Sequence, residues 1–195
     1  MATNIENAIL SRARELRVDG ISRPSSSGYS NETVFFRARW REGTAWHQRR
    51  YVARIEPRTP PVYPLQTAQA LPSVALQYRV MQAVAHAGGV PVAPLVGHEE
   101  SDALLGGPFY VMDFVDGDVP KDNPVYTKEG FFVAANAGQR HRLIDSGLAA
   151  LARLHAIEPG PAGLDWLAGG VRPGLGRQLE IYRRYASELL GGRAH

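Results

Sequence analysis

A polar turn near the N-terminus contains the first residues whose side chains and backbone groups could bind a ligand. It spans residues 24–33, PSSSGYSNET, and its hydroxyl and backbone N–H groups can cradle phosphate oxygens. Most turns rich in serine and glycine are only turns, so the composition alone leaves that simpler interpretation open. The candidate phosphate contacts are Ser27, Gly28, Ser30, Asn31 and Thr33.

Arg54 is a second candidate, within the segment RYVARI at residues 50–55. Alternation along a strand places Val52 and Arg54 on the same face. Because a guanidinium can hold phosphate oxygens through paired hydrogen bonds, this face could bind a phosphorylated ligand. The alternative interpretation is an ordinary strand arginine that faces solvent.

These candidates need a sheet to position them. Residues 34–40, VFFRARW, alternate apolar and basic side chains, as a half-buried strand does. A short turn-bearing loop separates them from the strand at residues 50–55, so the two strands should pair as an antiparallel hairpin. The other elements expected of this α+β unit are a helix over residues 73–87, capped by Ser73, and strands over residues 90–97 and 108–115.

Further helices should lie on both sides of this unit. An amphipathic helix is expected over residues 4–17, with the apolar residues Ile5, Ile9, Leu10 and Leu16. In the second half of the chain, helical spacing relates Ile144, Leu148, Leu151 and His155. We interpret residues 141–145, HRLID, as the start of that helix, capped by Asp145 or a nearby polar residue, and we expect a last helix over residues 175–190.

Composition and charge exclude several classes of function. The 195 residues include no cysteine, which rules out disulfides, thiolate nucleophiles and Cys-ligated zinc. The net charge of +3 gives little drive for nucleic-acid binding, so no nucleic-acid partner is expected. The chain has neither a signal peptide nor an apolar run long enough to span a bilayer, which predicts a cytoplasmic protein without a membrane partner.

Several segments, in the right order, give the chain a family resemblance. Together they resemble the aminoglycoside-phosphotransferase-like family of kinases, in the branch similar to the kinase-like domain of acyl-CoA dehydrogenase family members. The segments are GYSNETVFF (28–36), YVARIEP (51–57), QYRVMQAVA (77–85), VPVAPLVG (90–97), GPFYVMDFVDG (107–117), DNPVYTKEGF (122–131) and LARLHAIEP (151–159).

The resemblance implies a protein-kinase-like α+β fold, with an N-lobe of antiparallel sheet plus helix C and the first helices of a truncated helical C-lobe. The implied domains are an N-terminal helix (1–19), the nucleotide-covering N-lobe (20–116), a hinge (117–126) and the start of the C-lobe (127–195). The implied function of the complete enzyme is transfer of the γ-phosphate of ATP, with Mg²⁺, to a hydroxyl group of an unknown small molecule.

The same resemblance assigns a role to each candidate residue. The turn residues would cover the phosphates, and Val52 would contact adenine. Arg54, in place of the family's usual lysine, would hold phosphate, and Gln77 would orient it. Backbone groups facing the adenine edge would come from Met112, Asp113, Phe114 and Val115.

Two departures from the family pattern shape the expected activity. Gln77 stands where the family typically has a glutamate, so it can hydrogen-bond Arg54 but cannot neutralise it. The family's HGD catalytic loop, its downstream asparagine and its metal-binding aspartate do not occur before the sequence ends at His195. We therefore expect a truncated chain that is inactive alone. The alternative is a nucleotide-binding pseudokinase or scaffold module without catalysis.

The resemblance also implies that the helices beyond residue 126 leave apolar side chains uncovered. Such a surface favours self-association. The residues concerned are Ile144, Leu148, Leu151, Leu154, Trp166, Leu179, Tyr182 and Leu189.

Overall fold

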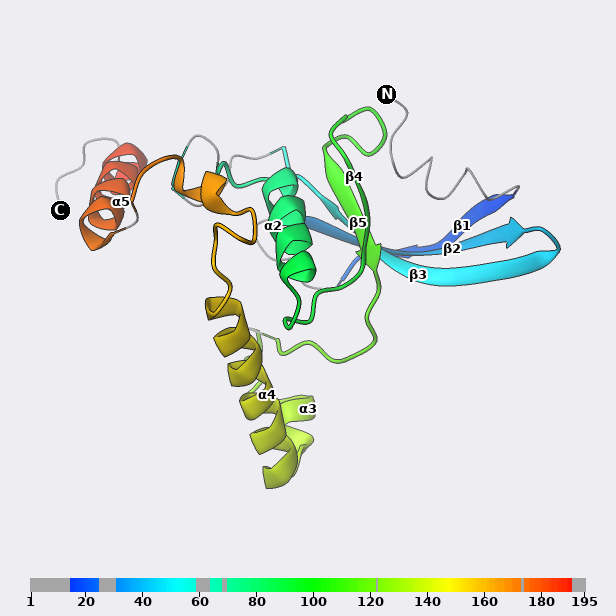
Figure 1. Ribbon diagram of the computed structural model, residues 1–195. Coiled ribbons are helices and arrows are strands. Elements are labelled where there is room, and N and C mark those ends of the chain that lie inside the picture. Colours follow the sequence, from blue (N-terminus) through cyan, green and yellow to red (C-terminus); the bar gives the residue numbers. More distant parts are fainter. Residues whose placement is uncertain are drawn as a thin grey trace.

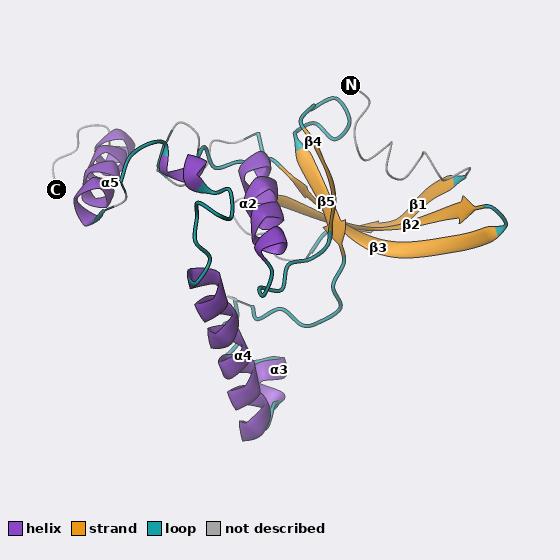
Figure 2. Ribbon diagram, viewed as in Figure 1, coloured by secondary structure: helices purple, strands orange, loops and turns teal. Residues whose placement is uncertain are grey.

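The computed structural model describes residues 15–24, 31–58, 64–67, 70–121, 123–172 and 174–190, without the side chains of residues 189 and 190. A five-stranded antiparallel sheet forms one part of the molecule, and helices form the other (Figures 1 and 2). Helix α2 lies against the sheet, whereas α4 and α5 extend away from it (Figure 1). Within the described residues, no helix is both long enough and apolar enough to cross a membrane.

The sheet has the strand order β1-β2-β3-β5-β4. Its strands are β1 (Leu16–Ser22), β2 (Glu32–Glu42), β3 (Ala45–Ile55), β4 (Leu95–Glu99) and β5 (Phe109–Asp113). The predicted hairpin is confirmed and is longer than expected, because β2 and β3 pair from Glu32↔Ile55 to Glu42↔Ala45. Gly43 has a φ of 62° at the tip, a conformation that glycine adopts without steric cost.

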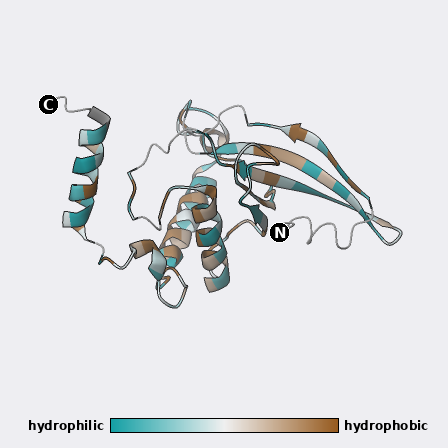
Figure 3. Ribbon diagram, turned by 90° about the horizontal axis from the view of Figure 1, so that it is seen from above, coloured by the Kyte–Doolittle hydropathy of each residue, from teal (hydrophilic) through white to brown (hydrophobic). Residues whose placement is uncertain are grey.

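The two faces of the sheet differ in what they carry. Alternating side chains of the strands form a core on one face, made of Ala38, Tyr51, Ala53, Ile55, Phe109 and Val111. The alternation is visible as changes between brown and teal along the strands in Figure 3. The intervening residues face the other side, where Tyr110 of β5 meets helix α2 through Gln77.

Helix α2 (Val74–Ala87) confirms the helix predicted over residues 73–87. The Ser73 hydroxyl accepts a hydrogen bond from the Leu76 N–H at 3.1 Å, which caps the helix as expected. A carboxylate oxygen of Glu56 accepts a second bond from the Val74 N–H at 2.9 Å. Because Glu56 follows the last residue of β3, this bond joins the helix N-terminus to the sheet.

The helices of the second half are α3 (Phe131–Ala134), α4 (Ala137–His155), the 3-10 helix η1 (Asp165–Ala168) and α5 (Leu175–Leu190). The α5 prediction is confirmed. The start predicted for α4 was wrong, because Asn136 caps the helix and Asp145 lies inside it. Asn136 and Gln139 form a capping box, in which each side chain bonds the other residue's backbone N–H at 2.9 and 2.8 Å.

Two other predicted boundaries are corrected. The helix expected over residues 4–17 cannot include its last residues, since β1 begins at Leu16; residues 4–14 lie outside the described residues. The strand expected over residues 90–97 begins only at Leu95. Pro91 and Pro94 explain the delay, because proline has no N–H to donate to a neighbouring strand.

The apolar surface predicted on the later helices is present on α4 and α5. Ile144, Leu148, Leu151 and Leu154 are exposed on α4, and Leu179 and Tyr182 are exposed on α5. Trp166 was wrongly included, because the Arg79 guanidinium lies 3.8 Å from its ring centroid and the residue is only partly exposed. The side chain of Leu189 lies outside the description.

We predict that the α4 surface drives self-association. Leu148 is 59% exposed, and a charge there should oppose burial of the surrounding leucines against another chain. In sedimentation velocity, the Leu148→Glu variant should stay monomeric at concentrations where the wild type associates. Ser146→Glu is the matched control, because it adds the same charge on the opposite side of the helix. A wild type that remains monomeric at every concentration would contradict the prediction.

Candidate functional site

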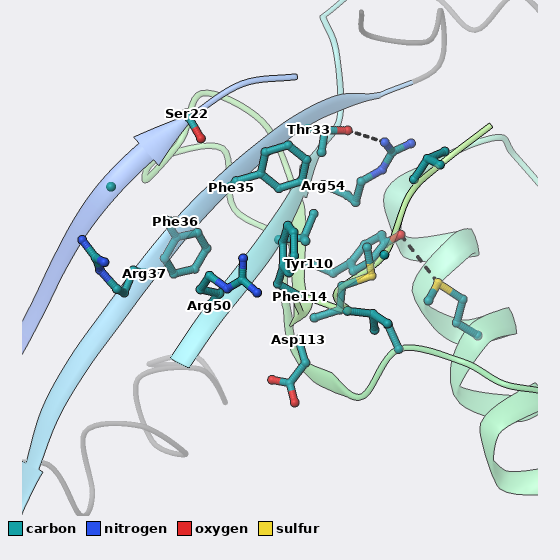
Figure 4. A pocket seen from close by; sticks show the side chains of 18 of the residues that line it. Ser22, Thr33, Phe35, Phe36, Arg37, Arg50, Arg54, Tyr110, Asp113 and Phe114 are labelled. Carbon is teal, nitrogen blue, oxygen red and sulfur yellow. Dashed lines mark hydrogen bonds between the residues drawn. The ribbon is translucent and has the colours of Figure 1, made fainter. Parts of the chain in front are cut away.

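A pocket of about 820 Å³ lies on the sheet face that α2 partly covers (Figure 4). The structure brings eight of the predicted site residues to its wall, from β2, β3, α2 and the end of β5. They are Thr33, Val52, Arg54, Gln77, Met112, Asp113, Phe114 and Val115. Residues far apart in the sequence therefore converge on one cavity.

Arg54 is held in the pocket by neutral partners. Its guanidinium donates a hydrogen bond to the Thr33 hydroxyl on the neighbouring strand, as Figure 4 shows. The two other arginines that line the pocket pair with carboxylates: Arg37 with Asp19 at 2.5 Å, and Arg50 with Asp116. No described carboxylate forms an ion pair with Arg54, so its charge is available to an anionic ligand.

Tyr110 links Arg54 to helix α2. Burial raises the pKa of the Tyr110 hydroxyl, and the charge of Arg54 and a hydrogen bond with it act in the opposite direction. The same hydroxyl lies 3.4 Å from Oε1 of Gln77 and 3.6 Å from Sδ of Met81. The described hydrogen bond of the Gln77 side chain is therefore with Tyr110, so any influence of Gln77 on the orientation of Arg54 passes through that ring.

The segment after β5 presents one candidate backbone donor. The Asp113 N–H donates to the Pro94 carbonyl at 2.8 Å, and the Phe114 N–H donates to the Arg50 carbonyl at 3.0 Å. Neither N–H is free for a ligand. No described residue accepts a hydrogen bond from the Val115 N–H, so Val115 is the residue of this segment best placed to donate one.

At the end of the pocket, the Phe114 ring contacts both another aromatic ring and a guanidinium group. The ring meets Phe35 edge to face, with 5.5 Å between the centroids. The Arg50 guanidinium lies 4.2 Å from the Phe114 centroid. These contacts fix the ring without involving Arg54.

Other predicted residues lie outside the pocket wall. Asn31 is buried next to β2, and its Nδ2 has no hydrogen-bond partner within the described structure. It does not line the cavity. Ser27, Gly28 and Ser30 lie outside the described residues, so their predicted phosphate contacts remain predictions.

Sequence reasoning missed several residues of the wall, among them Phe35, Arg50, Met81 and Tyr110. The sequence could have indicated Arg50 as a pocket residue, since alternation along β3 places it on the same face as Val52 and Arg54. Phe35 and Tyr110 follow only from the register, in which they pair with Val52 and Arg54 respectively.

Among the described residues, no three His, Cys, Asp or Glu side chains gather closely enough to hold a metal ion. The Mg²⁺ implied by the family resemblance remains a prediction, since Mg²⁺ in such enzymes is often held by only one or two carboxylates together with substrate phosphates.

We predict that Gln77→Glu raises stability by about 1 kcal/mol. A carboxylate at this position can accept the Tyr110 hydrogen bond and also attract the unpaired charge of Arg54. Thermal unfolding should therefore shift upward relative to the wild type. Gln82→Glu, the same change at an exposed position of α2, is the matched control. A lower melting temperature for Gln77→Glu alone would show that residue 77 does not act on Arg54.

Comparison with known proteins assigns the chain to a family. The sequence profile of the phosphotransferase enzyme family matches residues 22–192. The fold is similar to the crystal structure of a candidate aminoglycoside phosphotransferase from Ralstonia eutropha JMP134, with a TM-score of 0.56 and 23% sequence identity. That match covers 98% of this chain and 48% of the other, so this chain spans about half the length of that protein. Since the family profile extends over most of the sequence, the chain belongs to the phosphotransferase enzyme family, and its five-stranded sheet with α2 is part of a kinase-like fold.

Proposed function

We propose that the pocket binds ATP and that the chain supplies the nucleotide-binding lobe of a small-molecule kinase. The observation that carries the proposal is Arg54, a guanidinium that pairs with no carboxylate among the described residues, on the wall of a largely apolar cavity. A charge in such a place favours an anionic ligand with an apolar part. A nucleoside triphosphate combines these two properties.

The proposed orientation follows from the chemistry of the two ends of the pocket. Arg54 and the Thr33 hydroxyl would bind phosphate oxygens, through charge-assisted and neutral hydrogen bonds respectively. Val52 and Met112, which pair across β3 and β5, would cover the adenine ring. The Val115 N–H would donate to the adenine edge. Ser27, Gly28, Ser30 and Asn31 would complete the phosphate side.

In the complete enzyme we propose transfer of the γ-phosphate to a hydroxyl group of a small molecule. The family match supports transfer of a phosphoryl group. The division into an N-lobe up to residue 116, a hinge up to residue 126 and the beginning of a C-lobe belongs to the same proposal.

Calorimetric titration with competition tests nucleotide binding. ATP should bind saturably with one site per chain. Adenosine and inorganic triphosphate should each weaken the apparent affinity for ATP, because they would occupy different ends of one pocket. Absence of saturable ATP binding would overturn the proposal. Competition by triphosphate alone would overturn the adenine assignment and leave a phosphate site.

A second candidate is a nucleotide-binding module that performs no transfer. Gln77 favours it, because a glutamine bonded to Tyr110 leaves Arg54 without the carboxylate partner that the family resemblance implies. The two candidates differ in turnover. Release or transfer of ³²P from labelled ATP by the purified chain would exclude the module, whereas saturable binding without turnover is expected of both candidates, because the kinase lobe is expected to be inactive alone.

A further inference from the structure

Strand β1 forms one edge of the sheet, where the strand order β1-β2-β3-β5-β4 ends (Figure 1). No described segment pairs with its outer side. Proline, which cannot donate to a neighbouring strand, is absent from its sequence LRVDGIS. Its apolar side chains are exposed: Leu16 at 38%, Val18 at 50% and Ile21 at 69%. An apolar edge of this kind is a template for a further strand.

The pairing between β1 and β2 shows which backbone groups of β1 point outward. The Arg41 N–H donates to the Glu15 carbonyl at 3.1 Å, so these two residues form a hydrogen-bonded pair of the ladder. In an antiparallel ladder, hydrogen-bonded and non-hydrogen-bonded pairs alternate along the strands. The backbone groups of Arg17 therefore face β2, whereas the N–H and C=O groups of Leu16 and Val18 point away from the sheet.

The side chains of β1 separate by polarity between the two faces of the sheet. Leu16 and Val18 lie on the face that carries the core, where Val18 lines an apolar groove of about 360 Å³. Arg17 and Asp19 lie on the opposite face. Asp19 pairs with Arg37 at 2.5 Å, but Arg17 forms no ion pair with a carboxylate of the described residues.

These two properties select one register for an antiparallel copy of β1. Outward backbone groups must meet outward backbone groups, so even-numbered residues lie opposite even-numbered residues. With a two-fold axis at Val18, Val18 lies opposite its own copy and Arg17 lies opposite Asp19 of the second copy. An axis at Arg17 or at Asp19 would instead set like charges against each other. Charge complementarity therefore favours the register centred on Val18.

We infer that β1 is a docking edge for a second copy of this chain, which adds its own β1 across a two-fold axis at Val18. On one face, Arg17 would reach the second carboxylate oxygen of Asp19 of the other chain, since Arg37 already bonds the first. On the other face, Leu16 and Val18 of both copies would form an apolar row that joins the two grooves. The sheet would then continue across both chains.

The proposed edge contact is separate from the other sites of the molecule. It uses neither the α4 surface nor nucleotide binding. The irregular pairing of β1 between Asp19 and Ser22 confines it to the first residues of the strand. Because so short an interface is weak, it should require higher protein concentrations than association through α4.

Disulfide trapping tests the inference on the full chain, which contains no cysteine of its own. The experiment uses the Leu148→Glu background, where association through α4 should not contribute. Val18→Cys would place two Cα atoms about 5.5 Å apart across the axis, a distance that a disulfide bridges. Ile21→Cys is the matched control: this position is more exposed, but the same register separates it from its own copy by about 20 Å.

Under mild oxidation, Val18→Cys should form covalent dimers about tenfold faster than Ile21→Cys. Random collision would give the opposite order, because the thiol at position 21 is more accessible. In denaturant the preference for Val18→Cys should disappear.

A change of charge supplies the second test. Arg17→Glu would set two carboxylates against each other on both sides of the axis, so it should slow dimer formation by Val18→Cys roughly fivefold or more. Arg39→Glu is the matched control, because it makes the same change on the same face but on β2, away from the edge. The rate with Arg39→Glu should stay close to that of Val18→Cys alone.

Each of the contrary results would overturn the inference. Covalent dimers that form from Ile21→Cys as fast as from Val18→Cys would exclude an axis at Val18. An equal rate with and without Arg17→Glu would exclude the pairing of Arg17 with Asp19 of the second copy. Failure of Val18→Cys to form dimers at any protein concentration would show that β1 does not receive a second copy.

Discussion

The Arg54→Ala variant should bind ATP with an affinity roughly 10- to 150-fold lower than that of the wild type, a loss of about 1.5–3 kcal/mol. The pocket holds two other arginines, but Asp19 and Asp116 already pair with them. Arg54 bonds only to hydroxyl groups in the described structure, so its charge is the one least compensated before a ligand arrives. Removing it should therefore weaken binding of phosphate more than binding of adenine.

Calorimetry with ATP and adenosine separates these contributions. The affinity for adenosine should change little in Arg54→Ala, because the proposed adenine contacts come from Val52, Met112 and Val115. Arg39→Ala is the matched control: it removes the same charge from the same sheet, but Arg39 does not line the pocket. An unchanged ATP affinity in Arg54→Ala, or an equal loss in Arg39→Ala, would remove Arg54 from the phosphate site.

Arg54→Lys tests geometry apart from charge. Lysine keeps the positive charge but loses the planar pair of donors, and its ammonium group need not reach Thr33 and Tyr110 together. We expect an ATP affinity between those of the wild type and Arg54→Ala. Affinity equal to that of the alanine variant would mean that the hydrogen-bond geometry, rather than the charge, carries the interaction.

The parts of the fold that follow local rules could be predicted from the sequence. Alternation in VFFRARW and RYVARI predicted the β2–β3 hairpin, and Ser73 predicted the start of α2. The capping box of α4 was also a local signal, since Asn136 precedes Gln139 by three residues, yet the prediction placed the helix start at residues 141–145. The apolar spacing that predicted this helix begins only at Ile144, so it could not indicate the earlier turns.

The parts of the site that depend on long-range pairing could not be predicted. Arg54 meets Tyr110 because β3 pairs with β5 in a register that no local pattern specifies. The same pairing places Val52 beside Met112. Met112 was predicted as a site residue from the resemblance to a kinase lobe, which does not require knowledge of this register. The resemblance gave no reason to include Tyr110, which connects Arg54 with Gln77.

The other large expected effect is a loss of stability on substitution of Gly107, which lies at the junction between β3, β5 and α2. A Cβ atom at this position would lie 2.6 Å from the carbonyl oxygen of Glu56, far inside van der Waals contact. Glu56 cannot easily move away. Its N–H donates to the Pro108 carbonyl at 2.8 Å, and its carboxylate accepts from the Val74 N–H at 2.9 Å.

Gly107→Ala should therefore destabilise the protein by about 1–3 kcal/mol, the usual cost of forcing extra atoms into a packed site. For a chain of this length, that corresponds to a melting temperature lower by roughly 2–12 °C. Gly147→Ala is the matched control: Gly147 is exposed within α4, and an added Cβ there meets no atom within 4 Å. That substitution should raise stability by up to about 1 kcal/mol, because alanine favours a helix more than glycine does. If Gly107→Ala melted at or above the wild-type temperature, the close approach of Gly107 to Glu56 would be wrong, and with it the tight junction that sets β5 beside β3 and brings Tyr110 to Arg54.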